Sequence, residues 1–255
     1  MGKLRGILQL TGQLDGLSFY LMNGKIIVRK TGGFDGKKIK QDANYVRVRE
    51  NGSEFGHCAA AGRYFRRSLH PYLTTLKIRY VHNRVLCLFQ AISRLDLEHE
   101  RGQRRVFQGL QSVEAKQIIA GFEFDKDCAF RTIFPFTPSI HLDEGRLTIP
   151  NFEASQLQKV PGATHIQLRF ILIGLDFEHQ RPFKQQCSTL VTVSLATNTP
   201  ASDLVLQANV PSAPFVFGLL HVAYVQRLGN MDYTFQTGGL KVVGYGTYDY
   251  PIQNL

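Results

Sequence analysis

The spacing of the apolar residues changes twice along the chain, and each change limits the fold. Over residues 1–53 apolar and polar residues alternate, as they do in half-buried strands. Over residues 54–120 apolar residues recur every three or four positions, which is the period of an amphipathic helix. From residue 121 the alternation returns. The pattern predicts an α+β protein: a basic N-terminal β-hairpin arm (1–53), a helical region (54–120) and a C-terminal antiparallel β-sandwich of immunoglobulin-like type (121–255).

The arm carries the clearest local signal. Asn23-Gly24 separates Leu17–Met22 from Lys25–Lys30, and Asn-Gly supplies the two positive φ angles of a type I′ turn. The alternation at Tyr45-Val46-Arg47-Val48-Arg49 predicts another extended segment, with Tyr45, Arg47 and Arg49 on one face. A two-stranded hairpin is marginal by itself in water. We therefore expect the arm to lie on something, either the protein's own body or a neighbour.

The middle of the chain predicts a helical hairpin followed by two shorter helices. His70-Pro71 separates the two long helices, because proline suits the first turn of a new helix. Ser112 is expected to cap the last helix and Gly121 to end it. The expected ranges are 54–69, 71–99, 103–110 and 112–120.

The C-terminal part predicts short strands at the spacing of a β-sandwich, separated by glycine and proline turns. The expected strands are 122–124, 129–134, 139–142, 146–149, 164–178, 188–196, 203–208, 215–226, 233–237 and 240–245.

Positive charge is concentrated in the first two-fifths of the chain. The formal net charge is +10; residues 1–105 hold 20 Lys and Arg against 8 Asp and Glu, while residues 106–255 hold 10 against 12. Cations interleaved with aromatic residues are typical of single-strand nucleic-acid binding, whereas a basic arm can also dock on a mildly acidic partner. The candidate residues for partner or nucleic-acid binding are Lys25, Arg29, Lys30, Lys37, Lys38, Lys40, Arg47, Arg49, Arg63, Arg66 and Arg67.

Motifs for catalysis or cofactor binding are missing from the sequence. The segment from Gly32 to Lys38 has three residues between its outer glycines and Lys38 where a phosphate loop needs a hydroxyl. Gly-x-Ser-x-Gly and His-Glu-x-x-His do not occur, and the four cysteines form no Cys-x-x-Cys pair. Cys58 falls on the apolar face of its helix, so we expect a core thiol. The sequence predicts no enzyme, no cofactor and no metal.

A five-residue pattern, Leu-Asp-x-Glu-His, occurs at Leu95–His99 and again at Leu175–His179. Aspartate, glutamate and histidine are metal ligands, so a metal site is one interpretation. The first copy is expected to end a helix and the second a strand, so their side chains should fan out differently. Chance similarity on two solvated ends is the favoured interpretation.

Several segments resemble a family of uncharacterised bacterial proteins. The resemblance is carried by Gly16–Tyr20, Val28–Gly33 and Arg49–Gly56, and later by Ala120–Phe124 and Gly239–Val243. The family has no assigned activity, so the resemblance implies a rough architecture and no catalytic residues. It also implies a stand-alone protein that lacks a signal peptide.

These features together predict a non-enzymatic structural or assembly protein. It would self-associate or dock on partner subunits through its basic arm, by adding strands to a neighbour. A nucleic-acid-binding protein that uses residues 25–67 is the alternative, and a carbohydrate-binding β-sandwich is a second one. No apolar run is long enough for a membrane span or a signal peptide. Synthesis in the cytoplasm is expected, with later release or incorporation into an extracellular assembly left open.

Overall fold

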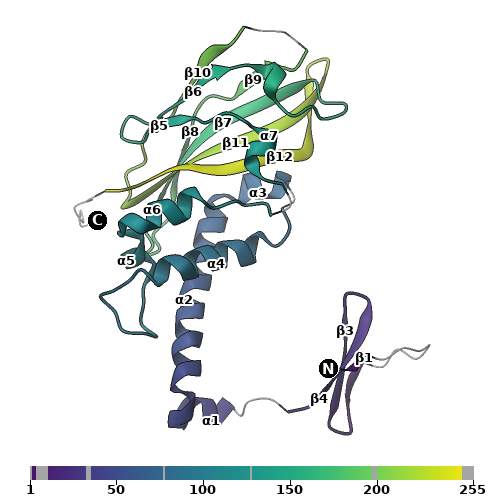
Figure 1. Cartoon of the computed structure of the whole chain (residues 1–255), viewed down its shortest axis with the longest axis vertical. Coiled ribbons are helices and arrows are strands. Elements are labelled where there is room, and N and C mark those ends of the chain that lie inside the picture. Colours follow the sequence, from purple (N-terminus) through teal and green to yellow (C-terminus); the bar gives the residue numbers. More distant parts are fainter. Residues whose placement is uncertain are drawn as a thin grey trace. The chain divides into compact units, whose positions relative to one another are not determined.

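The computed structural model describes residues 2–3, 11–32, 36–76, 78–126, 128–196 and 200–248. The chain divides into two compact units, Met1–Asn51 and Gly52–Leu255. Helix α2 (Val46–Ser68) begins in the first unit and continues in the second (Figure 1). The predicted α+β class with antiparallel sheets is confirmed. The helical region and the β-rich region share one unit, so the boundary expected near Gly121 lies inside it.

The first unit contains a four-stranded antiparallel sheet in the order β1-β4-β3-β2. Its strands are β1 (Gly2–Lys3), β2 (Gly12–Leu14), β3 (Leu17–Met22) and β4 (Lys25–Lys30). The hairpin predicted at Asn23-Gly24 is confirmed, and both residues have the positive φ of a type I′ turn, 52° and 73°. The sheet is larger than a hairpin because β1 and β2 add to its two sides.

The extended segment expected at Tyr45–Arg49 is wrong. A 3₁₀ turn, η1 (Ala43–Tyr45), leads directly into α2. Arg49 Nη1 donates to the carbonyl oxygens of Ile39 and Asp42 at 2.6 and 2.9 Å, which ties α1 (Gly36–Gln41) to α2. Successive helical residues are rotated by about 100°, so Arg47 and Arg49 point in directions about 200° apart and share no face.

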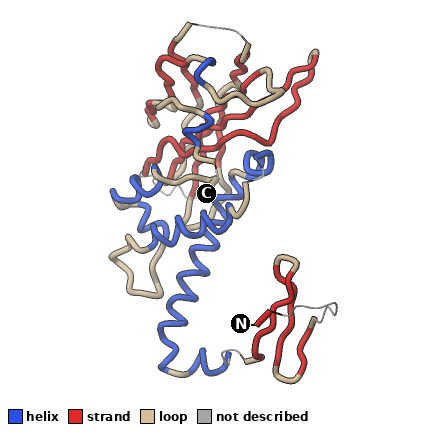
Figure 2. Tube along the Cα trace, turned by 45° about the vertical axis from the view of Figure 1, so that its right-hand side comes forward, coloured by secondary structure: helices blue, strands red, loops and turns tan. Residues whose placement is uncertain are grey.

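The second unit has three layers, and its central layer is a sheet in the order β12-β11-β7-β8 with β9 also on β7. A three-stranded sheet, β10-β6-β5, covers one face and helices cover the other (Figures 1 and 2). The strands are β5 (Ser139–His141), β6 (Arg146–Phe152), β7 (His165–Leu175), β8 (Lys184–Cys187), β9 (Val191–Ser194), β10 (Ser202–Gln207), β11 (Phe215–Leu228) and β12 (Met231–Thr247).

Strands β7 and β11 are buried on both faces, which explains their nearly continuous apolar sequences. On the helix side, Ile171 and Phe217 pack with Phe65 of α2 in one cluster. On the other side, Phe170 and Leu220 pack with the small sheet. The two sheets therefore lie face to face as in a sandwich, but helices cover the outer face of the larger one.

The helical layer differs from the expected long hairpin. The helix expected over 71–99 is two helices, α3 (His70–Leu76) and α4 (Val81–Ser93), and Tyr80 between them has a left-handed φ of 55°. Next come α5 (Val106–Leu110) and α6 (Val113–Ala120). The cap predicted at Ser112 is confirmed, because its side chain accepts a hydrogen bond from Glu114 N. Within the described ranges, no helix is long and apolar enough to cross a membrane.

Four strand predictions in the C-terminal part need correction. The strand expected at 129–134 is the short helix α7 (Phe130–Ile133), because Phe130, Ile133 and Phe134 bury side chains at helical spacing. Residues 122–124 contribute only an isolated bridge between Glu123 and Lys241. The strands expected at 233–237 and 240–245 are one strand, β12, and β8 was not expected. A second 3₁₀ turn, η2 (Ala154–Gln156), follows β6.

Candidate functional site

The eleven predicted cations are distributed over both units. Lys25, Arg29 and Lys30 lie on β4, and Lys37, Lys38 and Lys40 lie on α1. Arg47 and Arg49 lie in the first turn of α2. The remaining three, Arg63, Arg66 and Arg67, lie on the part of α2 that belongs to the second unit. They are therefore not a single patch within one unit. Gly33, Phe34 and Asp35 of the glycine-rich segment lie outside the described residues.

Some of these cations have structural roles. Arg49 joins α1 to α2, as described above, and Arg47 forms an ion pair with Glu50 at 2.9 Å. Arg66 Nε donates to the Gly62 carbonyl, and burial followed by the charge of Arg63 lowers the pKa of Arg66. Arg63 and Arg67 are exposed one helical turn apart, without a carboxylate partner in the ranges that the structure covers.

One face of the N-terminal sheet is apolar. The strand register places six apolar side chains on it, with Lys30 at one end. Leu14, Leu17 and Leu21 are 65, 39 and 58 % exposed, while Ile26, opposite Leu21 on β4, is buried. We call this surface the apolar face; its residues are Leu14, Leu17, Phe19, Leu21, Ile26 and Val28.

The opposite face of the same sheet is mixed and basic. Lys25 and Arg29 point to this side together with Ser18 and Tyr20. The Arg29 guanidinium lies over the Tyr20 ring, 5.7 Å from its centroid. This cation–π contact occupies one side of the ring. We call this surface the basic face.

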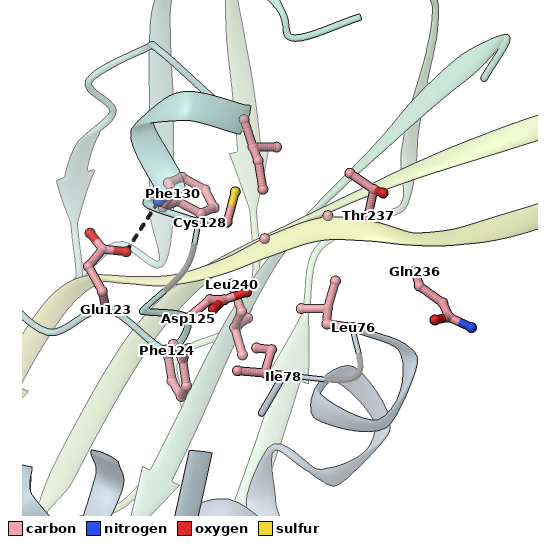
Figure 3. A pocket seen from close by; sticks show the side chains of 13 residues that line it. Leu76, Ile78, Glu123, Phe124, Asp125, Cys128, Phe130, Gln236, Thr237 and Leu240 are labelled. Atoms are coloured by element: carbon pink, nitrogen blue, oxygen red, sulfur yellow. Dashed lines mark hydrogen bonds between the residues drawn. The ribbon is translucent and has the colours of Figure 1, made fainter. Parts of the chain in front are cut away.

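A cavity of about 230 Å³ lies in the second unit, between β12 and the segments 123–125 and 128–130 (Figure 3). Leu76, Ile78 and Leu240 line its apolar side. Glu123 lies at the opposite side, where it accepts hydrogen bonds from Phe130 N at 3.2 Å and from Lys241 Nζ at 2.6 Å. The carboxylate charge is therefore already compensated within the fold.

The thiol in this cavity is a poor nucleophile. Burial, followed by the charges of Asp125 and Glu123, raises the pKa of Cys128 above the usual value for a thiol. The group is therefore protonated at neutral pH, whereas the thiolate is the reactive species. The cavity offers space and an apolar wall but no activated group.

The two Leu-Asp-x-Glu-His segments adopt the same local structure, so the expectation that their side chains fan out differently is wrong. Asp96 Oδ1 accepts hydrogen bonds from the backbone N–H of Glu98 and His99, and Asp176 Oδ1 does the same for Glu178 and His179. In each copy the histidine Nδ1 also contacts the aspartate, at 2.9 and 3.2 Å. Both aspartates are buried rather than solvated. The pattern specifies an Asx-type turn that follows α4 in one copy and β7 in the other.

Helix α2 supports both turns. Glu54 Oε1 accepts from Gly102 N, and His57 Nε2 accepts from Val106 N, on the segment that follows the first turn. Tyr64 Oη donates to the Arg181 carbonyl and accepts from Asp176 N at the second turn. The repeated motif therefore fixes loops against a helix. The described residues contain no group of three or more metal-ligating side chains.

Cys58 is a core thiol, as predicted. It is fully buried, and its sulfur lies 3.3 Å from Ser93 Oγ and 3.6 Å from the Phe89 carbonyl oxygen. Burial is the main cause that raises its pKa. The adjacent His57 points elsewhere, toward Val106 N, so the two residues do not form a nucleophile and base pair.

Comparison of the chain with protein families, with characterised proteins and with solved structures gave no match.

Proposed function

We propose that the protein is a non-enzymatic assembly subunit that pairs with a second copy of itself through the apolar face of its N-terminal sheet. The observation that carries the proposal is the exposure of Leu14, Leu17 and Leu21 on one side of a small sheet. Contiguous exposed apolar side chains of this kind are typical of interaction surfaces.

The charge distribution limits how a second copy could dock on this unit. The first unit holds ten Lys and Arg against four Asp and Glu, a net charge of +6. Two copies would repel each other unless they met on a surface poor in cations. The apolar face is such a surface, because Lys25 and Arg29 point to the opposite side and, among the described side chains of the sheet, Lys30 alone lies at its end. A two-fold axis through this face would bring identical leucines together.

The expected free energy of association is that of a reversible dimer. The exposed parts of the three leucines equal roughly one and a half leucine side chains per copy. Since a fully buried leucine contributes about 1.5–3 kcal/mol, two copies would gain roughly 5–9 kcal/mol. Association costs about 4–15 kcal/mol in lost translational and rotational freedom. Burial of the leucines is therefore needed for association, and its free energy is of the same size as this cost.

The edge of the same sheet offers a separate contact, which a face-to-face pair leaves free. Strand β2 pairs with β3 only as far as Phe19, so the outer edge of residues 20–22 has no partner strand in the part of the chain that the structure describes. An open edge is a template for pairing with another chain. The immunoglobulin-like character of the second unit stays part of this proposal, as the body that would carry the docking sheet.

Co-purification of tagged and untagged copies of the full chain tests the proposal. Untagged wild type should be retained by tagged wild type, and the double substitution Leu17→Asp with Leu21→Asp in both copies should abolish retention. Ser18→Asp is the matched control, because it adds a negative charge on the basic face. Retention that survives the leucine substitutions would contradict the proposal.

The basic face supports nucleic-acid binding as the second candidate. Lys25, Arg29 and Tyr20 combine cations with an aromatic ring, as single-strand binders do. Under this alternative, Lys25→Glu with Arg29→Glu should abolish steeply salt-dependent binding to a labelled oligonucleotide. Under the assembly proposal the same variant should co-purify with its partner copy unchanged. The carbohydrate-binding alternative stays a prediction.

A further inference from the structure

Five polar side chains meet between α3 and the central sheet of the second unit. Arg169 of β7 and His221 of β11 are directly opposite in the strand pairing, so both point to the helix side. Gln185 and Cys187 of β8 are opposite Ile173 and Ile171, which places them on the same side. Tyr72 of α3 completes this group, which we call the Arg169 cluster.

The members of the Arg169 cluster are in contact. Tyr72 Oη lies 3.3 Å from Cys187 Sγ, and Gln185 Nε2 donates to Tyr72 Oη at 2.9 Å. Burial, followed by Cys187, raises the pKa of Tyr72 to about 12, and the nearby charge of Arg169 partly opposes this shift. The rings of Tyr72 and His221 are 5.1 Å apart between centroids. Burial, followed by the charge of Arg169, lowers the pKa of His221 to about 4, so His221 is neutral at neutral pH.

Two nitrogens of the Arg169 cluster lack a hydrogen-bond partner among the described residues. They are Arg169 Nε and His221 Nε2, and both are hidden from solvent. Arg169 also has no carboxylate within ion-pair distance in the described parts of the chain, whereas other arginines and a lysine there do. The Arg169 side chain is only half-buried, so its guanidinium can meet an anion from solvent although its Nε is hidden. The site therefore offers a positive charge without a carboxylate partner among the described residues.

The Arg169 cluster lies near the edge of the central sheet. Strands β8 and β9 both pair with β7 but are interrupted between residues 187 and 191, next to Arg169. Ser188 holds the interruption in place, since its N–H donates to the Phe170 carbonyl and its Oγ accepts from Phe170 N. Cys187 and Leu190, on either side of Ser188, are exposed.

We propose that the Arg169 cluster binds the carboxylate group of a small molecule, with Arg169 as its ion-pair partner and His221 and Tyr72 as hydrogen-bonding neighbours. The planar guanidinium matches a carboxylate, and charge-assisted hydrogen bonds of this type are the strong ones. The site supplies one positive charge because His221 is neutral. A monoanionic carboxylate balances that charge, whereas a phosphate dianion leaves an excess. The inference is independent of the proposed self-association.

Protection of Cys187 from alkylation tests the proposal on the wild-type full chain. Iodoacetamide labelling of each cysteine is followed by mass spectrometry with increasing sodium acetate, and sodium chloride keeps the ionic strength constant. Acetate should slow labelling of Cys187 several-fold and saturably. Cys87, which is also exposed, is the internal control and should react at an unchanged rate. Equal effects on both cysteines, or none on Cys187, would overturn the proposal.

NMR spectroscopy tests whether acetate binds at Arg169 itself. In ¹³C-edited spectra, the ring signals of His221 should shift saturably with acetate in wild type and in Cys187→Ser. They should not shift in Arg169→Met, whereas Arg227→Met, which removes an exposed arginine paired with Asp232, should behave as wild type. Inorganic phosphate is the competing probe. Tighter binding of phosphate than of acetate would refute the carboxylate assignment.

Discussion

The burial of His221 predicts a specific pH dependence of stability. In the folded chain the pKa of His221 is lowered from 6.5 to about 4, mainly by burial and then by Arg169. The unfolded chain therefore takes up a proton near pH 6.5, whereas the folded chain does so only near pH 4. The part of the unfolding free energy that is linked to His221 is fully present above pH 6.5. It is lost as the pH falls toward 4, because the unfolded state binds more protons in that window. The difference corresponds to about 3 kcal/mol.

Urea unfolding of wild type and His221→Gln at pH 7 and at pH 4 measures this contribution. Other groups add to the wild-type slope, since the pKa of His57 and that of Asp96 are also lowered in the fold. Because both proteins contain these other groups, their contributions cancel when the two proteins are compared. The variant should lose about 3 kcal/mol less than wild type between the two pH values. Equal losses in both proteins would refute the reasoning.

Three further substitutions test the packing of the second unit. Gly109→Ala should destabilise the fold by at least about 2 kcal/mol, because a Cβ at this position would overlap the Ile92 carbonyl; thermal unfolding measures it. Asp96→Asn should cost about 2 kcal/mol in urea unfolding, because the buried carboxylate accepts several backbone hydrogen bonds, whereas exposed Glu98→Gln should have no effect. Tyr80→Gly should stabilise the chain by up to about 1 kcal/mol by relieving a left-handed φ, and an unchanged or lower melting temperature would contradict that expectation.

Local signals in the sequence predicted the elements whose chemistry is itself local. Asn23-Gly24 determined a hairpin through its positive φ angles, and Ser112 determined a helix start through its side-chain oxygen. The alternation at 45–49 failed because Val46 and Val48 are both exposed in α2, so their spacing reflects no buried face. In the same way, aromatic residues at 130 and 134 are buried from a helix rather than from a strand.

The Arg169 cluster could not be predicted from the sequence, because its members come together only through the strand register and the docking of α3. Tyr72 and His221 are far apart in the chain, and neither belongs to a short motif. The repeated Leu-Asp-x-Glu-His pattern did carry a usable signal. An aspartate whose carboxylate can accept hydrogen bonds from the N–H groups two and three residues later predicts an Asx-type turn. The apolar face of the N-terminal sheet was also implicit in the alternation of β3, once the hairpin register was known.

The mass of the full chain in solution as a function of concentration tests the central claim most directly. Light scattering should give a mass that rises from 28.8 kDa toward twice that value as the concentration increases. The Leu17→Asp, Leu21→Asp variant should stay at 28.8 kDa, and Ser18→Asp should follow wild type. A wild-type mass of 28.8 kDa at every concentration, or a dimer that the leucine substitutions leave intact, would contradict assembly through the apolar face.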